Sequence, residues 1–382
     1  MAARPERWSL DDLLLACEAS GVDYYCGVPD SSLAGLGPLL DARSGCQHQI
    51  AINEGQAVAW AIGYHLATGR LPLVYLQNSG LGHAMNPLVS LADPSVWGIP
   101  MIMLVGWRGL PGQPDEPQHQ RQGQITEALL HQMGCQPRRL VSDRNEMREQ
   151  VGEATATARS RGHPVALLLA PTACRPGPVE TLPATSLPGR EQAIEQIVAA
   201  LPPRAVVVAT TGKASRELVE IRRRADQRHD QDLLVVGGMG HAASIAAAIA
   251  ERQPARPIYC LDGDGAVLMH LGALATTGSQ DPANLYHFVL NNGAHESVGG
   301  QPTVGWEIDF CAVALACGYR QAHRCRGPGE LAAILTDLPR QDGPVLIDVR
   351  LSCRSRPDLA RPDLKPEANK RAFVRYLLRE VG

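Results

Sequence analysis

Two short polar motifs in the second half of the sequence carry residue types that could do chemistry together. Gly263-Asp264-Gly265 follows the short apolar run 258–261, and Asn291-Asn292 follows a second such run, 287–290. Runs of this kind predict buried strands, so both motifs stand at strand ends. The segment 266–276 between them has apolar residues at helical spacing. We therefore predict one βαβ unit with both motifs at the carboxyl edge of its sheet, where open α/β sheets bind ligands.

The residue types in these motifs favour an oxygen-ligated cation beside a diphosphate. A hard cation such as Mg²⁺ takes one carboxylate plus neutral oxygens, and the phosphates of its ligand supply the rest. Asp264 and an asparagine amide fit this set, and the flanking glycines let the backbone approach a diphosphate closely. For Gly-Asp-Gly alone, an acidic turn between strand and helix is the alternative. A calcium loop fits poorly, because Ala266 and Val267 stand where a ligand and the turn glycine belong.

At this spacing the two motifs resemble the signature of the thiamine-diphosphate-dependent enzymes. The resemblance implies thiamine diphosphate and Mg²⁺ as cofactors. It also implies that Asp264, Asn292 and the backbone carbonyl of Ala294 bind the metal ion, while Asn291 has a structural role.

The composition suits a two-domain protein that acts on small molecules. The chain has 382 residues, a net charge of −3 and 20% charged residues, which favour neither nucleic acid as a partner nor a disordered tail. No apolar run reaches the length of about 18 residues that a membrane span needs. Ten cysteines are scattered without a Cys-x-x-Cys pair, which suggests thiols in a reducing compartment. The first residues lead into an N-cap pattern at Ser9 and not into the apolar core that a signal peptide has. We therefore expect a cytoplasmic protein.

Strand-like apolar runs alternate with helical segments along the chain, which predicts a parallel α/β architecture. Further runs are 71–76, 101–105, 165–169, 205–208, 233–236 and 345–349. The proline-rich stretch 171–189 divides this pattern almost in half and suggests a stiff linker. We expect an α/β domain over 1–172, a linker over 173–190 and a second α/β domain over 191–382. The halves resemble each other only in their alternation of elements.

A glutamate in the first half opens an alanine-rich helix. Glu54 lies in Asn53-Glu54-Gly55-Gln56-Ala57, where its charge could simply stabilise the helix dipole. The family resemblance implies more, since its members carry a cofactor-activating Glu in this context. It implies that Glu54 is catalytic and hydrogen-bonds the aminopyrimidine ring. It also implies a pyrimidine-binding first domain and a diphosphate-binding second domain, with no middle domain.

A glycine-rich stretch, 236–244, follows a predicted strand and precedes a helix. By itself it suits phosphate binding and a tight packing turn equally well. The resemblance implies that the Gly237 carbonyl binds the aminopyrimidine and that Met239 supports the bent cofactor, although a Met is ordinarily a core residue. Further candidates for cofactor binding share a position at predicted strand ends or helix starts: Gly212, His241, Ser244, Gly265 and Ala266.

Segments in both halves, among them 53–69, 75–93 and 291–302, resemble the branch of this family that decarboxylates 2-oxo acids carrying a phosphonate or a sulfonate. The resemblance implies conversion of 3-phosphonopyruvate to phosphonoacetaldehyde and CO₂ through the cofactor's ylide and enamine, in phosphonate antibiotic biosynthesis. Sulfopyruvate is the alternative substrate, and carboligation of the acetolactate synthase type is the alternative reaction. A magnesium-nucleotide-binding regulatory protein is the non-catalytic alternative, which would not need Glu54.

A phosphonate or sulfonate on the substrate needs cationic donors beyond those for pyruvate. We expect Arg108, His83 and His119 to bind this anion, with both histidines also candidates for proton transfer, and His295 to bind substrate near the reacting centre. Each alone is also typical of a surface or capping residue. Because Glu54 and the metal motif lie in different halves, and family members join such halves across subunits, we expect a homodimer or larger homo-oligomer with active sites at the interface.

Overall fold

The computed structural model describes residues 7–175, 177, 185–353 and 355–379. Two compact units make up the chain, one of residues 1–181 with 298–301 and the other of residues 182–297 with 302–382. Part of the expected linker, residues 176 and 178–184, lies outside the described residues. The domain limits at 172 and 191 therefore stay a prediction.

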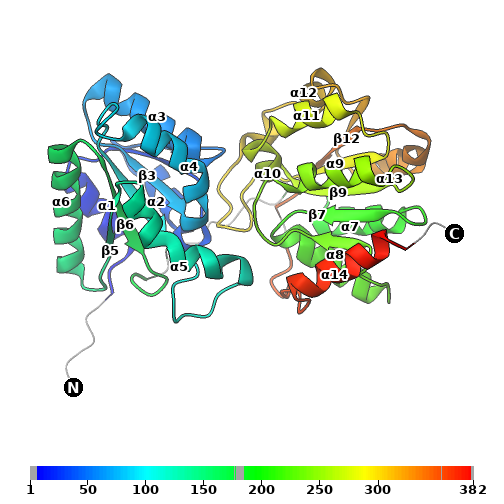
Figure 1. Cartoon of the computed structure of the whole chain (residues 1–382), viewed down its shortest axis with the longest axis horizontal. Helices are drawn as coiled ribbons and strands as arrows, with labels where there is room; N and C mark the ends of the chain where they lie inside the picture. Colours follow the sequence, from blue (N-terminus) through cyan, green and yellow to red (C-terminus); the bar gives the residue numbers. More distant parts are fainter. Residues whose placement is uncertain (1–6, 176, 178–184, 354, 380–382) are drawn as a thin grey trace. The chain divides into compact units, whose positions relative to one another are not determined.

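The first unit contains a six-stranded parallel sheet with helices on both faces (Figure 1). Its strand order is β2-β1-β3-β4-β6-β5. The strands are β1 (Tyr24–Gly27), β2 (Gln47–Ile50), β3 (Leu73–Gln77), β4 (Met101–Gly106), β5 (Gln136–Arg139) and β6 (Pro164–Leu169). Helices α1 (Leu10–Ala19), α2 (Leu36–Asp41) and α6 (Arg144–Arg161) bury their apolar side chains on one face. On the opposite face lies α3 (Glu54–Thr68), with α4 (Leu81–Pro87) beside it.

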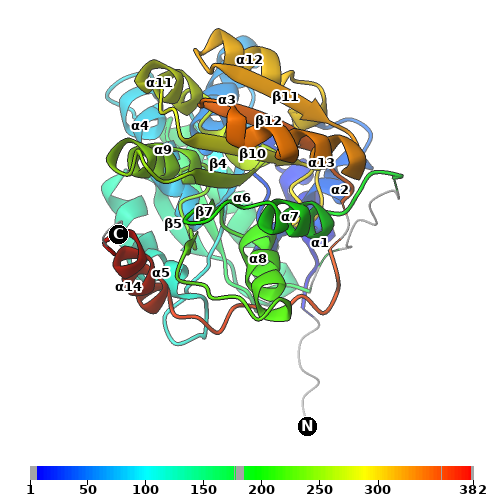
Figure 2. The same cartoon turned by 90° about the vertical axis from the view of Figure 1, so that its right-hand side faces the viewer.

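The second unit also contains a six-stranded parallel sheet, in the order β11-β12-β10-β9-β7-β8. The strands are β7 (Val206–Ala209), β8 (Asp232–Leu234), β9 (Ile258–Gly263), β10 (Leu285–Asn291), β11 (Gln321–Cys325) and β12 (Val345–Arg350). Figure 2 shows α7 (Arg190–Ala199), α8 (Lys213–Arg224) and α13 (Pro328–Asp337) together, and all three pack on one face of the sheet. Helices α9 (Ala242–Arg252) and α14 (Pro366–Leu377) pack on the other face.

Both sheets have the same topology when their strands are numbered within each unit. The order is 2-1-3-4-6-5 in the first unit, and the second unit reads the same when it is listed from β8. The predicted architecture of two parallel α/β sheets is confirmed. The halves share a strand order as well as the alternation of elements that their sequences show.

The strands that the sequence does not predict are mainly polar edge strands. β2, β5 and β11 each lie at the edge of a sheet, and they read Gln-His-Gln-Ile, Gln-Pro-Arg-Arg and Gln-Ala-His-Arg-Cys. An edge strand carries polar residues because part of it faces water, so it lacks the apolar run that marks a central strand.

The single helix expected over 266–276 is wrong. The structure has two short helices instead, α10 (Asp264–Met269) and α11 (Ala273–Gln280). Gly272 stands at the N-cap of α11, and glycine is a poor helix former in a helix interior.

The ten cysteines are free thiols, and Cys17 and Cys260 are fully buried. Burial raises the pKa of the Cys17 thiol to about 12 and that of Cys260 well above its usual value. Such thiols behave as small apolar residues rather than nucleophiles. Among the described helices, none combines the length and the apolar character that crossing a membrane requires.

Candidate cofactor and active site

The Gly263-Asp264-Gly265 motif ends β9 and opens α10. β9 and β10 are parallel neighbours with Gly263 in register with Leu290, so Asp264 and Asn292 leave the sheet at the same edge. The side chains are buried, with 2% of Asp264 and 4% of Asn292 exposed. Burial raises the pKa of Asp264 to about 6, although the Thr303 hydroxyl donates to its carboxylate. A bound cation would favour the charged form of such a carboxylate.

The donors at this edge fit a hard cation. The Asn292 Oδ1 atom accepts the backbone N–H of Ala294 at 3.1 Å, which leaves this amide oxygen with a second lone pair. Asn291 is used differently, since its Nδ2 donates to the Gly305 carbonyl at 2.8 Å and to Asp348 Oδ1 at 2.9 Å. A carboxylate, an amide oxygen and a nearby backbone carbonyl form the kind of oxygen set that Mg²⁺ takes.

Close contacts around Gly265 and Gly240 form a cradle next to Asp264. A Cβ atom on Gly265 would lie 3.1 Å from the His295 Cε1 atom and 3.5 Å from the Met239 Cε atom. Gly240 has a φ of +85°, and a Cβ there would lie 2.9 Å from the Ala266 carbonyl oxygen. Only glycine suits both the conformation and the space at Gly240. The structure thus brings together Met239, Gly265, Ala266 and His295, which the sequence analysis singled out separately.

The remaining cofactor candidates lie just before α8 and α9 or in the first turn of α9. Gly237 lies between β8 and α9, and Ser244 is exposed in the first turn of α9. The His241 Nδ1 atom lies 3.0 Å from the Gly238 carbonyl oxygen. Gly212 precedes α8 with a φ of +98°, and a Cβ there would lie 3.0 Å from the Ser297 Oγ atom, so its loop contacts the loop that follows Asn292.

His295 follows the Asn291-Asn292 motif, and its side chain is half-buried. Burial lowers the pKa of its imidazole to about 4, because desolvation disfavours the charged form. If His295 binds a substrate anion, it does so as a neutral hydrogen-bond donor and not as a cation.

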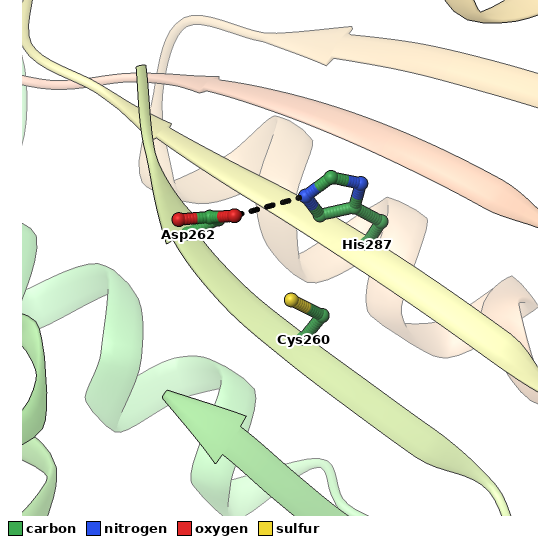
Figure 3. A group of neighbouring side chains, drawn as sticks. All are labelled: Cys260, Asp262 and His287. Carbon is green, nitrogen blue, oxygen red and sulfur yellow. Dashed lines mark ion pairs between the residues drawn. The ribbon is translucent and has the colours of Figure 1, made fainter. Parts of the chain in front are cut away.

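A second buried polar group lies just before the metal motif, formed by Cys260, Asp262 and His287 (Figure 3). The His287 Nε2 and Asp262 Oδ2 atoms are 3.7 Å apart, which is too long for a direct hydrogen bond. The other carboxylate oxygen, Asp262 Oδ1, accepts the backbone N–H of Gly263 at 3.1 Å. Asp262 thus contacts the backbone at the end of β9, one residue before Asp264.

Glu54 is the first residue of α3 in the first unit, and Asn53 caps the helix by accepting the Gln56 N–H at 2.9 Å. The glutamate is 5% exposed. Its Oε2 atom lies 2.7 Å from the His83 Nδ1 atom. The structure thus joins two predicted site residues that are far apart in the sequence.

Gly80 leaves the space that the Glu54 carboxylate occupies. A Cβ atom on Gly80 would lie 2.2 Å from Glu54 Oε1, whereas a Cβ on Gly82 would meet nothing within 4 Å. We expect Gly80→Ala to displace the carboxylate and, through the role that the sequence predicts for Glu54, to lower kcat by about 100-fold, the effect of moving a positioned group by about 1 Å. Gly82→Ala is the matched control, with kcat expected to stay within about twofold of the wild type. Steady-state kinetics of the two variants measure this, and equal kcat values would contradict the prediction.

The hydrogen bond that His83 donates to Glu54 raises the pKa of His83 above its usual value, although burial opposes it. A raised imidazole pKa stabilises the fold below the unfolded pKa of about 6.5, and this contribution disappears as the pH rises through the folded pKa. We expect Glu54→Gln to lower the pKa of His83, as measured by NMR titration of its Cε1–H resonance. An unchanged titration curve would show that the pair does not exist in solution.

Arg108 follows β4, but its charge is already paired. Its Nε atom donates to Asp115 Oδ2 at 2.9 Å and its Nη2 atom to Asp115 Oδ1 at 2.5 Å, while its Nη1 atom donates to the Ser31 hydroxyl at 2.8 Å. Burial raises the pKa of Asp115, but the hydrogen bonds from Arg108 and from the backbone N–H groups of Gly109 and Glu116 outweigh it and hold this pKa well below its usual range. The structure therefore presents Arg108 as part of an ion pair and not as an uncompensated cation.

The acidic residues around Arg108 were not predicted as site residues. Asp30 is 1% exposed in the segment after β1, where it hydrogen-bonds Ser32, and burial raises its pKa. The position of Asp30 just after β1 could have identified it as a candidate, because β1 and β4 end at the same edge of the sheet. His119 lies in the first turn of α5 (Pro117–Gln132), the helix that follows the Arg108 loop.

Models of protein families match most of the chain. The N-terminal TPP binding domain of the thiamine pyrophosphate enzymes matches residues 9–135, and the C-terminal TPP binding domain matches residues 210–349. The chain therefore belongs to the thiamine pyrophosphate enzymes, as the fold and the two motifs indicate.

Relatives with assigned names narrow the family further. The chain is 37% identical to phosphonopyruvate decarboxylase of Streptomyces viridochromogenes over 382 residues, covering 96% of this chain and 94% of the relative. It is 36% identical to phosphonopyruvate decarboxylase of Streptomyces hygroscopicus, with the same coverage. Sulfopyruvate decarboxylase of Methanosarcina acetivorans is 26% identical over 79% of this chain and 80% of the relative. These relatives confirm the resemblance to the phosphonate and sulfonate branch.

Proposed function

We propose that this protein decarboxylates 3-phosphonopyruvate to phosphonoacetaldehyde and CO₂ with thiamine diphosphate and Mg²⁺, as a step of phosphonate biosynthesis. The observation that carries the catalytic part is the buried Glu54 carboxylate, which is hydrogen-bonded by His83 and given room by Gly80. A magnesium-nucleotide-binding protein would have no use for such a carboxylate. The named Streptomyces relatives support the substrate.

The proposed roles divide between the two units. When bound, thiamine diphosphate supplies a carbon nucleophile and holds the electron pair that remains after CO₂ leaves. Glu54 exchanges a proton with the pyrimidine ring, and His83 keeps its carboxylate in place by holding Oε2. Asp264, Asn292 and the Ala294 carbonyl would hold Mg²⁺, and Met239 would support the cofactor. Gly212, Gly237, His241, Ser244, Gly265 and Ala266 line the rest of the proposed cofactor site.

The phosphonate is proposed to bind at the carboxyl edge of the first sheet. His83 follows β3, Arg108 follows β4 and His119 lies in the first turn of α5. His295 supplies a neutral donor from the second unit. Because Arg108 is paired with Asp115, the anion has to share its guanidinium, whose remaining N–H groups are suited to a tetrahedral oxyanion.

Glu54 and Asp264 belong to different units, yet both are proposed to act on one cofactor molecule. We propose that the protein is at least a homodimer in which the first unit of one chain and the second unit of its partner share an active site. Light scattering on the cofactor-loaded protein tests this, and an active monomer would exclude it. The free thiols support the proposal that the protein acts in a reducing compartment, the cytoplasm.

One assay tests the function directly. The purified protein is supplied with Mg²⁺ and thiamine diphosphate and offered phosphonopyruvate, sulfopyruvate or pyruvate, and aldehyde, CO₂ and condensation product are measured. We expect the highest kcat/KM for phosphonopyruvate, with aldehyde and CO₂ formed in equal amounts. Preference for sulfopyruvate or pyruvate would reject the substrate, and a condensation product in place of the aldehyde would indicate a carboligase.

A further inference from the structure

Glu296 lies four residues after the proposed metal ligand Asn292 and accepts hydrogen bonds from four groups. Its Oε2 atom accepts from the Asn292 Nδ2 atom at 3.0 Å and from the Arg190 Nη1 atom at 2.7 Å. Its Oε1 atom accepts from the Lys213 Nζ atom at 3.2 Å and from the Ser355 hydroxyl at 2.5 Å. The carboxylate therefore joins Asn292, which follows β10, to α7, to α8 and to the segment after β12.

Arg190 connects this carboxylate to the core of the second unit. It is 7% exposed, and it forms a two-pronged ion pair with the fully buried Glu217 of α8, with distances of 2.7 Å and 3.0 Å. Planar two-pronged pairs of this kind restrict both partners. Glu296 is thus held by a rigid guanidinium, and Asn292 is held by Glu296.

An ionised carboxylate only accepts hydrogen bonds. The amide of Asn292 must therefore turn its NH₂ group toward Glu296, and its Oδ1 atom must point the other way. If the amide were turned over, its oxygen would face the carboxylate and its NH₂ group would face the cation. Glu296 thus selects the amide orientation that a metal ion can use.

We propose that Glu296, held by Arg190, is a positioning residue for the metal site, which orients the Asn292 amide so that its oxygen faces the cation. This inference rests on the proposed magnesium site. It assigns to Glu296 a function in cofactor binding and no contact with the substrate.

The test uses Glu296→Gln, because a glutamine side chain has the same shape but both donates and accepts, and so no longer selects one amide orientation. Thiamine diphosphate binding to the metal-free protein is followed by calorimetry while the Mg²⁺ concentration is varied. We expect the Mg²⁺ concentration for half-maximal binding to rise by about 10- to 100-fold, the usual effect of losing a partner of a metal ligand. Glu296→Asp, which keeps an acceptor-only group, should restore part of the affinity.

Glu191→Gln is the matched control. Glu191 is also an ion-paired glutamate at the junction of α7, α8 and the segment after β12, where it binds Arg224 and Arg356, but its hydrogen bonds do not include Asn292. We expect its Mg²⁺ dependence to match the wild type. If Glu296→Gln does not fold, Ser355→Ala removes one donor to Glu296 and should raise the Mg²⁺ requirement by roughly two- to tenfold.

The outcomes separate this inference from the proposed function. If the wild type binds thiamine diphosphate only with Mg²⁺ and both Glu296→Gln and Ser355→Ala have the wild-type Mg²⁺ dependence, the positioning role is wrong and the metal site stands. An equal shift in Glu191→Gln would also overturn it, because any lost ion pair at the junction would then have the same effect. If the wild type itself binds without Mg²⁺, the proposed metal site fails first.

Discussion

Replacing Glu54 by Gln lowers kcat by about 10²- to 10⁴-fold, the contribution expected of a positioned acid–base group, and leaves Mg²⁺-dependent binding of thiamine diphosphate nearly unchanged. The reason is the division of the chain into two units. Glu54 opens α3 in the first unit, whereas Asp264 and Asn292 belong to the second. Glutamine keeps the size of the side chain and can still hydrogen-bond His83, but it cannot exchange a proton with the pyrimidine ring.

The matched control for Glu54 is Glu146→Gln. Glu146 is also an acidic residue in the first turn of a helix of the first unit, α6, but it is exposed. Its replacement removes only a helix-dipole interaction of about 0.3–1 kcal/mol, so kcat should not change. Steady-state kinetics and calorimetry compare the two variants. A Glu54→Gln enzyme with the kcat of the wild type would refute the catalytic role, and loss of cofactor binding would show that Glu54 serves binding instead.

Replacing Asp264 by Asn removes the only charged ligand from the proposed metal site. We expect the Mg²⁺ concentration for half-maximal thiamine diphosphate binding to rise by more than about 100-fold, beyond the effect of losing a residue that only supports a ligand. Asparagine retains an oxygen for the Thr303 hydroxyl, so the local hydrogen bond survives. Activity should fall with cofactor occupancy and recover in part at high Mg²⁺.

The same substitution should stabilise the metal-free protein. Because burial raises the pKa of Asp264 to about 6 from 3.8, the folded state binds more protons than the unfolded state between these values, and its stability falls as the pH rises from about 4 to 6. At pH 7 the buried charge therefore destabilises the metal-free fold by an amount on the order of 3 kcal/mol. Denaturant unfolding at pH 7 should show a higher free energy of unfolding for the metal-free Asp264→Asn protein than for the metal-free wild type.

Asp281→Asn is the control for Asp264→Asn. Asp281 is exposed at the end of α11 with a φ of +52° and pairs with Arg320, and asparagine tolerates this left-handed conformation well. Neither the Mg²⁺ dependence nor the stability at pH 7 should change by more than a small amount. A metal-free Asp264→Asn protein that is less stable than the wild type would contradict the assignment of a buried, uncompensated carboxylate.

The central strands and the polar motifs that follow β9 and β10 were predictable because they depend on the local sequence. β9 and β10 are buried on both faces, so their sequences are nearly continuous apolar runs, and the polar motif begins where each run ends. Glu54 was also visible, because its capped position at the start of α3 depends only on its neighbours. The polar edge strands and the break after α10 were not, since their conformations depend on pairing and packing with distant segments.

The sequence by itself determined the fold class, the family and the two groups of residues proposed to act on the cofactor, because these depend on local runs, turns and spacing. Only the tertiary structure decided which side chains meet: His83 with Glu54, Asp115 with Arg108, and Arg190 with Glu296 beside Asn292. The last contact joins residues 106 positions apart. Such contacts follow from the order of the strands and the packing of helices on the sheet, which no local pattern specifies.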